Sequence, residues 1–279
     1  MKTLLTLSLI GLAGGAQAAA TFDCLIEPTQ TIELRSTVGG RIEKIAARRG
    51  DKVQKGQVLV LLESSAERAT AESARYRAIM EGEEAVAQTK YEYAKRKYER
   101  KRDMHADKLM SGQERDDAEG EMRSAKAEVQ LAQDNRHVAS LEADEQSALL
   151  ARRSIRAPFN GVVADQLMYV GEVIEPGDPK KPILKLAQLD PLRVHLIMPR
   201  TAFGKVKKGM NVQVVPELPA VPRVQGTVVV IDSLIDAASG TFGVFVEVPN
   251  PETKVPAGVK CRATVPIDAA TARLPAEGG

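Results

Sequence analysis

A long proline-free segment constrains this chain most. After Ser64 the next proline is Pro158, and alanine, glutamate, lysine and arginine dominate the residues between them. Proline disrupts a helix interior and these four residue types favour helix, so the composition predicts a very long helical segment. Ser64 and Glu67 have the spacing of a capping box at its start, and Ser111 begins a second box that starts a new helix.

Two helices of roughly 40 residues joined by a tight turn must fold back on each other, and each would extend about 60 Å. The second helix also carries a coiled-coil spacing of small and apolar residues in steps of four and three. The residues of this seam are Ala118, Met122, Ala125, Val129 and Ala132. We therefore predict a projecting antiparallel helical hairpin over residues 65–154.

The two flanks of the hairpin repeat each other. In the order of the chain, Gly40, Gly50, Asp51, Val53 and Gly56 match Gly161, Gly171, Glu172, Ile174 and Gly177 with identical spacings. Glycine allows tight turns that strain other residues, so the six glycines are predicted to be structural turns. Each half has too few strands to be stable alone, so residues 24–64 and 155–189 are predicted to pair into one β-domain.

The remainder of the chain is predicted to be β-structure. Residues 190–268 contain short strand-like runs with proline and glycine at the joints, which favours a small β-barrel. Residues 269–279 are small and polar, and we expect a disordered tail. The predicted fold class is α+β, elongated and multidomain, with the helical hairpin inserted into a split β-domain that is followed by the barrel.

Residues 1–18 have the pattern of a secretory signal peptide. Lys2 precedes an apolar run, and Ala16-Gln17-Ala18 forms a small-residue cleavage site. We predict export to the periplasm as a soluble protein. Cys24 follows Asp23 rather than a small residue, so a lipoprotein is not expected.

The chain has two cysteines, Cys24 and Cys261. In an oxidising compartment an isolated pair of this kind often forms a disulfide, and we predict one between them. The alternative is two buried thiols that never meet.

The residues of an enzyme or metal site are not apparent. The three histidines, His105, His137 and His195, are far apart in sequence, and no cluster has metal-ligand spacing. No nucleophile-elbow motif is present. We predict no catalytic residues, metal or cofactor. The basic stretch 90–102 contains interleaved acids, and the net charge of the whole chain, +2, is small. A solvated helix face is therefore favoured over nucleic-acid binding.

The order of parts resembles a known family. Val38-Gly39-Gly40-Arg41-Ile42 before the hairpin and Ala157-Pro158-Phe159-Asn160-Gly161 after it look like two halves of a biotinyl/lipoyl-like domain. With the hairpin and barrel, residues 24–268 resemble the periplasmic adaptor (membrane fusion protein, HlyD-like) family. The hairpin occupies the place where a carrier domain would present its modified lysine, so a carrier role is not expected.

The resemblance implies an adaptor that links an inner-membrane transporter to an outer-membrane channel for export of small molecules, assembled as a homo-oligomeric ring. A transporter of the resistance-nodulation-division type is expected first, with an ABC-type exporter as the alternative. A stand-alone periplasmic coiled-coil scaffold is the alternative from another class. The family's further membrane-proximal domain is not expected here.

The family's hairpin tip carries an arginine, a leucine four residues later and a serine seven residues after that. Arg100, Met104 and Ser111 have this spacing, so the resemblance implies that they bind the outer-membrane channel, with methionine in place of leucine. Two alternatives stay open. Ser111 is also explained as a helix N-cap, and Met104 as a residue of the seam between the helices.

Overall fold

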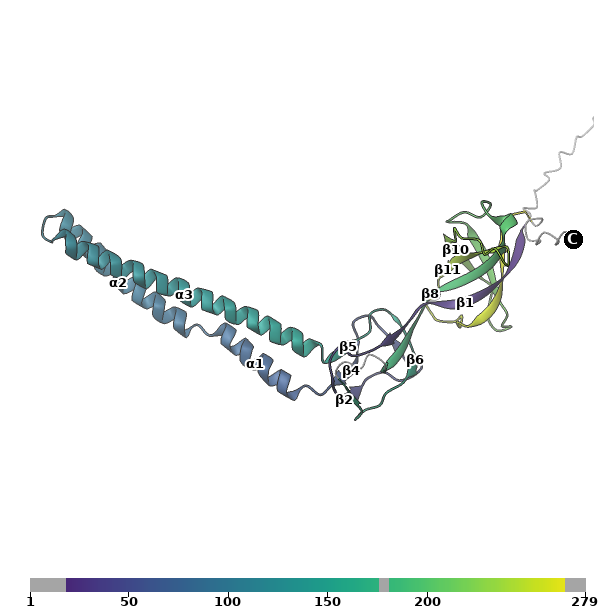
Figure 1. Cartoon of the computed structure of the whole chain (residues 1–279), viewed down its shortest axis with the longest axis horizontal. Helices are drawn as coiled ribbons and strands as arrows, with labels where there is room; N and C mark the ends of the chain where they lie inside the picture. Colours follow the sequence, from purple (N-terminus) through teal and green to yellow (C-terminus); the bar gives the residue numbers. More distant parts are fainter. Residues whose placement is uncertain (1–18, 176–180, 269–279) are drawn as a thin grey trace, which may run out of the picture.

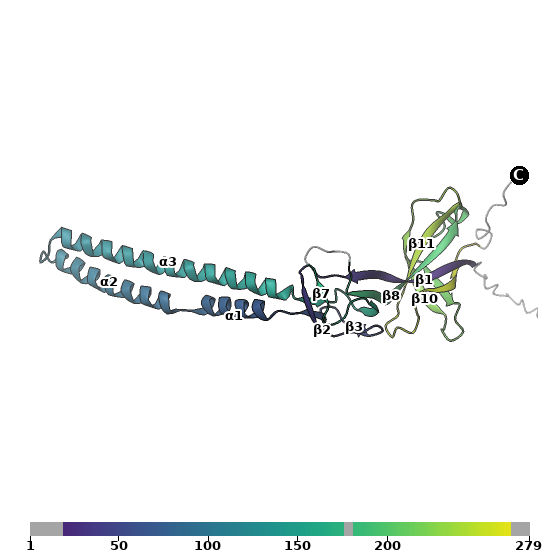
Figure 2. The same ribbon diagram turned by 60° about the horizontal axis from the view of Figure 1, so that its bottom comes forward.

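The computed structural model describes residues 19–175 and 181–268 of the chain. The molecule is long and narrow. A helical rod forms one end, a small β-domain lies in the middle, and a β-barrel forms the other end (Figures 1 and 2). The predicted signal peptide, Gly177 and the predicted tail lie outside the described residues.

Three helices build the rod: α1 (Ser65–Ile79), α2 (Gly82–Ala106) and α3 (Gly112–Ala151). α3 runs for 40 residues without a break, and α1 and α2 both pack along it. The packing is antiparallel. Arg75 on α1 donates to Ser147 near the end of α3, whereas Lys97 near the end of α2 donates to Glu121 near the start of α3.

The arms meet along a seam of alanines. Its buried members are Ala71, Ala74, Ala87, Ala94, Ala118, Ala125, Ala132 and Ala143. On α3 the first three are seven residues apart, which is the coiled-coil repeat. The predicted seam residues Met122 and Val129 are half-buried beside them. Small side chains allow the helix backbones to approach closely but bury little apolar surface.

The prediction of one continuous first arm is wrong. Met80 has extended backbone (φ −67°, ψ 127°) and ends α1, and α2 starts again at Gly82. Glycine costs about 1 kcal/mol relative to alanine inside a helix, so Gly82 favours a break here. Arg136 on α3 spans the gap with ion pairs to Glu81 and Glu84, at 3.2 and 2.9 Å.

The capping box predicted at Ser64 is also wrong. Ser64 precedes α1, but its side chain makes no capping hydrogen bond. Glu67, the other member, pairs instead with Arg153, which follows α3. The Ser65 hydroxyl and backbone N–H donate to Glu63 and lower the pKa of that carboxyl group. An ion pair across the base of the rod has therefore replaced a local cap.

The middle domain joins strands from both flanks of the rod. Before the rod come β2 (Gly40–Ile45), β3 (Lys52–Val53) and β4 (Val58–Leu62), and after it β5 (Ser154–Arg156), β6 (Gly161–Gln166) and β7 (Val173–Ile174). One sheet has the order β5-β4-β2-β7, and β3 pairs with β6. Its core includes Ile42, Leu59, Leu62, Ile155, Val163 and Leu186.

The pairing between the halves is reciprocal, as the sequence repeat predicts. Gly50 N donates to Val163 O at 2.8 Å, and Gly171 N donates to Ile42 O at 2.9 Å. These two bonds are equivalent under the repeat. Gly50 and Gly171 both have φ near +92°, a conformation that favours glycine.

The remaining described glycines of the repeat differ from one another. Gly40 and Gly56 also have positive φ, 152° and 83°. Gly161 does not, but a Cβ there would meet the carbonyl oxygen of Ala187. This glycine is therefore required by a close approach of backbone rather than by a turn.

The barrel is closed by six strands. Its strands are β1 (Ala20–Leu34), β8 (Leu184–Pro199), β9 (Asn211–Pro216), β10 (Val224–Ile231), β11 (Thr241–Val248) and β12 (Val259–Val265). Their order is β1-β12-β9-β10-β11-β8, and β8 pairs back to β1. Alternate residues point inward, and Val194, Leu196, Val214, Val244 and Ala263 are fully buried.

β1 and β8 belong to both the barrel and the middle domain. They pair from Cys24–Leu196 in the barrel to Leu34–Leu184 in the middle domain, with a register shift between Pro28 and Gln30. The predicted boundary between residues 189 and 190 therefore falls inside a continuous strand. The two domains are joined by shared backbone pairing rather than by a linker.

Asn250 fixes this junction from the barrel side. Its side chain is buried, donates to Leu189 O and Val255 O at 3.0 and 2.9 Å, and accepts from Val255 N at 3.1 Å. Its backbone N–H donates to Asp190 at 2.8 Å. The loop after β11 is thereby held against β8 at Leu189 and Asp190.

We expect Gly50→Ala and Gly171→Ala to destabilise the protein equally. Both glycines have the same left-handed φ and open space around them, so each substitution costs about 1–2 kcal/mol of backbone strain. Gly120→Ala is the control, because Gly120 is exposed within α3 and alanine there should stabilise by up to about 1 kcal/mol. Calorimetric unfolding measures all three. Unequal losses at the two turns would contradict their equivalence.

Asn250→Ala should lower stability by about 3 kcal/mol, because it leaves buried backbone groups without hydrogen-bond partners. Calorimetry of the purified protein measures this loss. Asn211→Ala is the matched control, since Asn211 is exposed at the start of β9. A loss no greater than that of the control would show that Asn250 does not fix the junction.

Candidate functional site

The far end of the rod begins with a left-handed turn after α2. Lys108 has φ 61°. Its N–H donates to His105 O at 2.9 Å, and the N–H of Leu109 donates to Met104 O at 2.8 Å. These two bonds form a Schellman motif, in which glycine usually takes the left-handed position. Because lysine takes this position instead of glycine, the sequence gives no sign that α2 ends here.

α3 starts with the predicted capping box, which is confirmed. The N–H of Glu114 donates to the Ser111 hydroxyl at 3.3 Å, and the N–H of Ser111 donates to the Glu114 carboxylate at 3.4 Å. The Ser111 hydroxyl and N–H lower the pKa of Glu114, and Lys101 nearby adds to this effect. The hydroxyl of Ser111 is therefore already engaged in the helix start.

The structure places Arg100, Met104 and Ser111 together at the tip. Arg100 and Met104 are one turn apart on the same face of α2. Arg100 is exposed and makes no ion pair within the part of the chain that the structure describes. Met104 is 41% exposed, so it is not a buried residue of the seam.

Leu109 is the tip residue that the sequence analysis missed. It is 73% exposed and follows the left-handed residue of the turn. In a Schellman motif this position commonly contacts the residue that Met104 occupies here. The sequence feature that could have identified Leu109 is its apolar side chain in an otherwise polar turn, just before the capping box of Ser111. The tip thus presents two apolar side chains, Met104 and Leu109, beside a basic one.

Ion pairing holds the two arms together behind the tip. Lys97 on α2 and Glu121 on α3 are 2.6 Å apart, and their hydrogen bond raises the pKa of Lys97 and lowers that of Glu121. Lys101 Nζ also donates to Glu114 O at 3.4 Å. The side chains of Lys97 and Lys101 thus reach from α2 across the seam to α3 and connect the two arms next to the tip.

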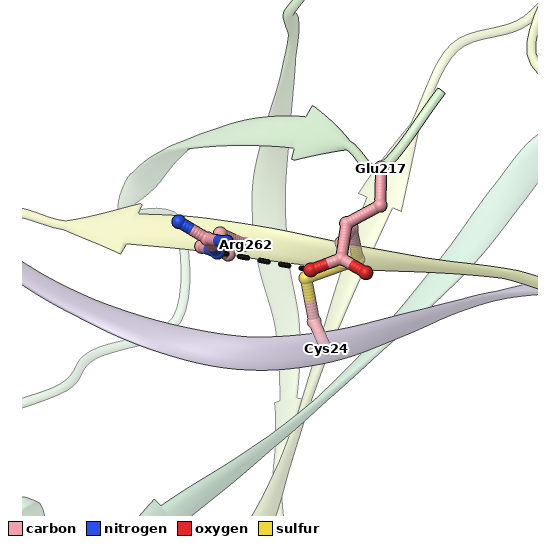
Figure 3. Close-up of a disulfide and its surroundings, with 4 residues drawn as sticks. Cys24, Glu217 and Arg262 are labelled. Carbon is pink, nitrogen blue, oxygen red and sulfur yellow. Dashed lines mark ion pairs between the residues drawn. A yellow bond between two sulfur atoms is a disulfide. The ribbon is translucent and has the colours of Figure 1, made fainter. Parts of the chain in front are cut away.

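The predicted cysteine pair lies at the opposite end of the molecule. Cys24 on β1 and Cys261 on β12 are directly opposed in the antiparallel ladder, with their Cα atoms 4.9 Å apart, and are joined as a disulfide (Figure 3). Arg262 and Glu217 lie beside it, with Nε and Oε1 3.7 Å apart. The bond connects the first and last strands of the barrel.

Residues 19–175 and 181–268 hold no group of three or more His, Cys, Asp or Glu side chains placed to bind a metal ion. No helix in these ranges combines the length and the apolar character needed to cross a membrane.

A family model described as the CzcB-like, barrel-sandwich hybrid domain matches residues 30–186. The pyoverdine export membrane fusion protein PvdR of Pseudomonas aeruginosa is 27% identical over 66% of this chain and 48% of its own length. The cobalt-zinc-cadmium resistance protein CzcB of Cupriavidus metallidurans is 23% identical over 80% of this chain and 40% of its own. The chain therefore spans half or less of these curated relatives.

Solved structures share the fold. MacA from Actinobacillus actinomycetemcomitans aligns with a TM-score of 0.71 at 21% identity, covering 89% of this chain and 78% of that one. The membrane fusion protein Spr0693 from Streptococcus pneumoniae R6 aligns with a TM-score of 0.60 at 14% identity, covering 88% of this chain and 98% of that one. These identities support the fold alone.

We expect the Cys24–Cys261 bond to be found in protein isolated from the periplasm, by mass spectrometry of non-reduced peptides. The bond closes a loop with a sequence separation of 237. In the chain-entropy model, reduction or the double variant Cys24→Ala/Cys261→Ala costs roughly 5 kcal/mol.

Calorimetry with and without reductant measures this cost. The double variant is its own control, because reductant should not change its unfolding. Two free thiols in the isolated protein would contradict the prediction.

Proposed function

The chain belongs to the CzcB-like barrel-sandwich hybrid family of membrane fusion proteins, and on this basis we propose that it is a periplasmic adaptor of a tripartite efflux pump. It links an inner-membrane transporter to an outer-membrane channel and has no catalytic role. A transporter of the resistance-nodulation-division type is the first candidate and an ABC-type exporter the second. The type of transporter encoded by a neighbouring gene would distinguish these two candidates.

The exposed tip of the rod is the observation that supports this proposal most. Met104, on α2, and Leu109, in the turn, are both exposed at the tip. The 40 residues of α3 extend about 60 Å between this tip and the middle domain. Even where the side chains of Met104 and Leu109 touch each other, as the Schellman motif favours, most of the surface of Leu109 stays exposed to solvent. We propose that they and Arg100 bind the periplasmic end of the outer-membrane channel, with Ser111 setting the start of α3.

Exposed apolar residues along the rod support assembly into a ring. They include Ile79, Val86, Leu131 and Val138. Val86 and Leu131 line one open hollow of about 390 Å³ between α2 and α3. We propose that a neighbouring copy packs its rod there. Lateral contacts of this kind would place several tips around one channel.

The names of the relatives suggest the kind of cargo. PvdR is named for the export of pyoverdine and CzcB for resistance to metal ions. For this chain we propose small molecules or ions as the exported class. We propose no role for the adaptor in selecting the exported cargo.

A photo-crosslinking amino acid at Met104 or at Leu109 should capture an outer-membrane channel in cells. The same amino acid at Leu149 is the control. Leu149 is exposed on α3, but it lies roughly 55 Å along the helix from the tip. Capture of no channel from either tip position would overturn the pump proposal and favour a stand-alone scaffold.

Two variants separate the contributions of the tip residues. Leu109→Ser removes an apolar contact and should reduce capture from Met104 by about ten-fold. Ser111→Thr keeps a hydroxyl that can accept from the Glu114 N–H and donate to its carboxylate, so thermal unfolding should stay close to wild type. Reduced capture by Ser111→Thr would then indicate channel contact, whereas unchanged capture would leave Ser111 as a cap alone.

A further inference from the structure

The strand order places two connections at the same end of the barrel. β8 enters from the middle domain and ends at Pro199, and each barrel strand is antiparallel to its neighbours. The connections β8–β9 (residues 200–210) and β10–β11 (residues 232–240) therefore both lie at the end far from the middle domain. Arg200 N donates to Gly240 O at 2.9 Å and joins them. We call these two segments the distal loops.

The distal loops carry exposed basic side chains. These are Arg200, which begins a short 3-10 helix, Lys205, Lys207 and Lys208. None of the four makes an ion pair within the described ranges, and residues 200–210 contain no acid. Their positive charge is therefore available to a partner.

The same loops carry exposed apolar side chains. Leu234 is 86% exposed, which is higher than any other large apolar residue among those described. Ile235 follows it at 42%, and Phe203 on the other loop is 46% exposed while its ring lies edge-on to Phe242 at 5.3 Å. These side chains lie on the same two connections as the basic ones.

Three of the described acidic residues, Asp232, Asp236 and Asp268, lie at this end. Asp236 accepts backbone N–H groups of Ala238 and Ser239, which lower the pKa of its carboxyl group. Asp232 is half-buried against Gly243. Asp268, after β12, also has a partner in the chain. The two distal loops therefore carry four basic residues against two acidic ones, Asp232 and Asp236.

The connections at the other end of the barrel lack this combination. The loop after β11 contains Glu252 and Lys254, which pair with each other at 2.5 Å. The connection from β9 to β10 contains Glu217 and Arg223, one of each sign. In these two connections one large apolar residue, Leu218, is exposed (37%), and it follows the acid Glu217.

We propose that the distal loops bind an anionic phospholipid surface. Apolar side chains that enter the headgroup boundary, flanked by lysines that meet anionic headgroups, are the chemistry of interfacial membrane binding. The loops lie at the opposite end of the molecule from the hairpin tip (Figure 1). This inference rests on the proposed function for one point: a tip directed at the outer membrane turns the distal loops toward the inner membrane.

Flotation of the purified mature protein with lipid vesicles tests the proposal. Binding is expected to vesicles of phosphatidylethanolamine with phosphatidylglycerol, to weaken as salt rises, and to be much weaker with phosphatidylcholine alone. Lys207→Ala/Lys208→Ala should weaken binding by about five-fold per lysine. Leu234→Ser should weaken it by about ten-fold.

Matched controls are available on the same chain. Leu167→Ser removes an exposed leucine of the middle domain, and Lys95→Ala/Lys126→Ala removes two exposed lysines of the rod. Both should bind vesicles like wild type. Calorimetry shows whether each variant is folded, and Leu234 is exposed enough for its loss to leave the fold intact.

Three results would overturn the inference: no binding to anionic vesicles, equal binding to both lipid compositions, or binding that the distal-loop variants do not change. A photo-crosslinker at Leu234 that captures a transporter without vesicle binding would show a protein partner instead. Channel capture from Met104 is independent of this assay. Vesicle binding without channel capture would therefore reject the pump proposal and leave the lipid site standing.

Discussion

Each half of the middle domain leaves backbone groups that only the other half can bind, and the rest of the molecule depends on this reciprocity. β2 pairs with β7, β3 with β6 and β4 with β5, so each of these pairs takes one strand from each side of the rod. α1 leaves after β4, and α3 returns before β5, its neighbour in the sheet. Because buried N–H and C=O groups must be paired, the two arms are forced to start side by side.

Arg153 strengthens this arrangement at the base of the rod. Its guanidinium donates to Gly39 O at 2.6 Å and pairs with Glu67 on α1. A Cβ at Gly40 would lie 2.7 Å from the same guanidinium, in addition to requiring a strained φ. The glycine of the repeat and the ion pair thus belong to one junction. It couples the start of α1 to the sheet and to the end of α3.

Features that a short stretch of sequence determines could be predicted. The repeat has fixed spacings because both halves make the same turn, and Ser111 has its whole capping box within four residues. Ser64 has the same local pattern, but Glu67 is taken by Arg153, which is distant in sequence. Leu109 was missed because Lys108 takes a left-handed conformation that sequence reading assigns to glycine. The sequence did not predict that β1 belongs to both the barrel and the middle domain, because the residues of a strand do not determine which strands it pairs with.

The connections along the molecule differ in how continuous their backbone pairing is. β1 and β8 carry paired backbone from the barrel into the middle domain, and Asn250 holds the adjoining loop. α3 then runs unbroken to the tip, whereas the other arm is interrupted between α1 and α2. Hydrogen-bonded backbone is therefore continuous from the barrel to the tip through β8, the reciprocal sheet and α3. The first arm of the rod lacks this continuity at Met80.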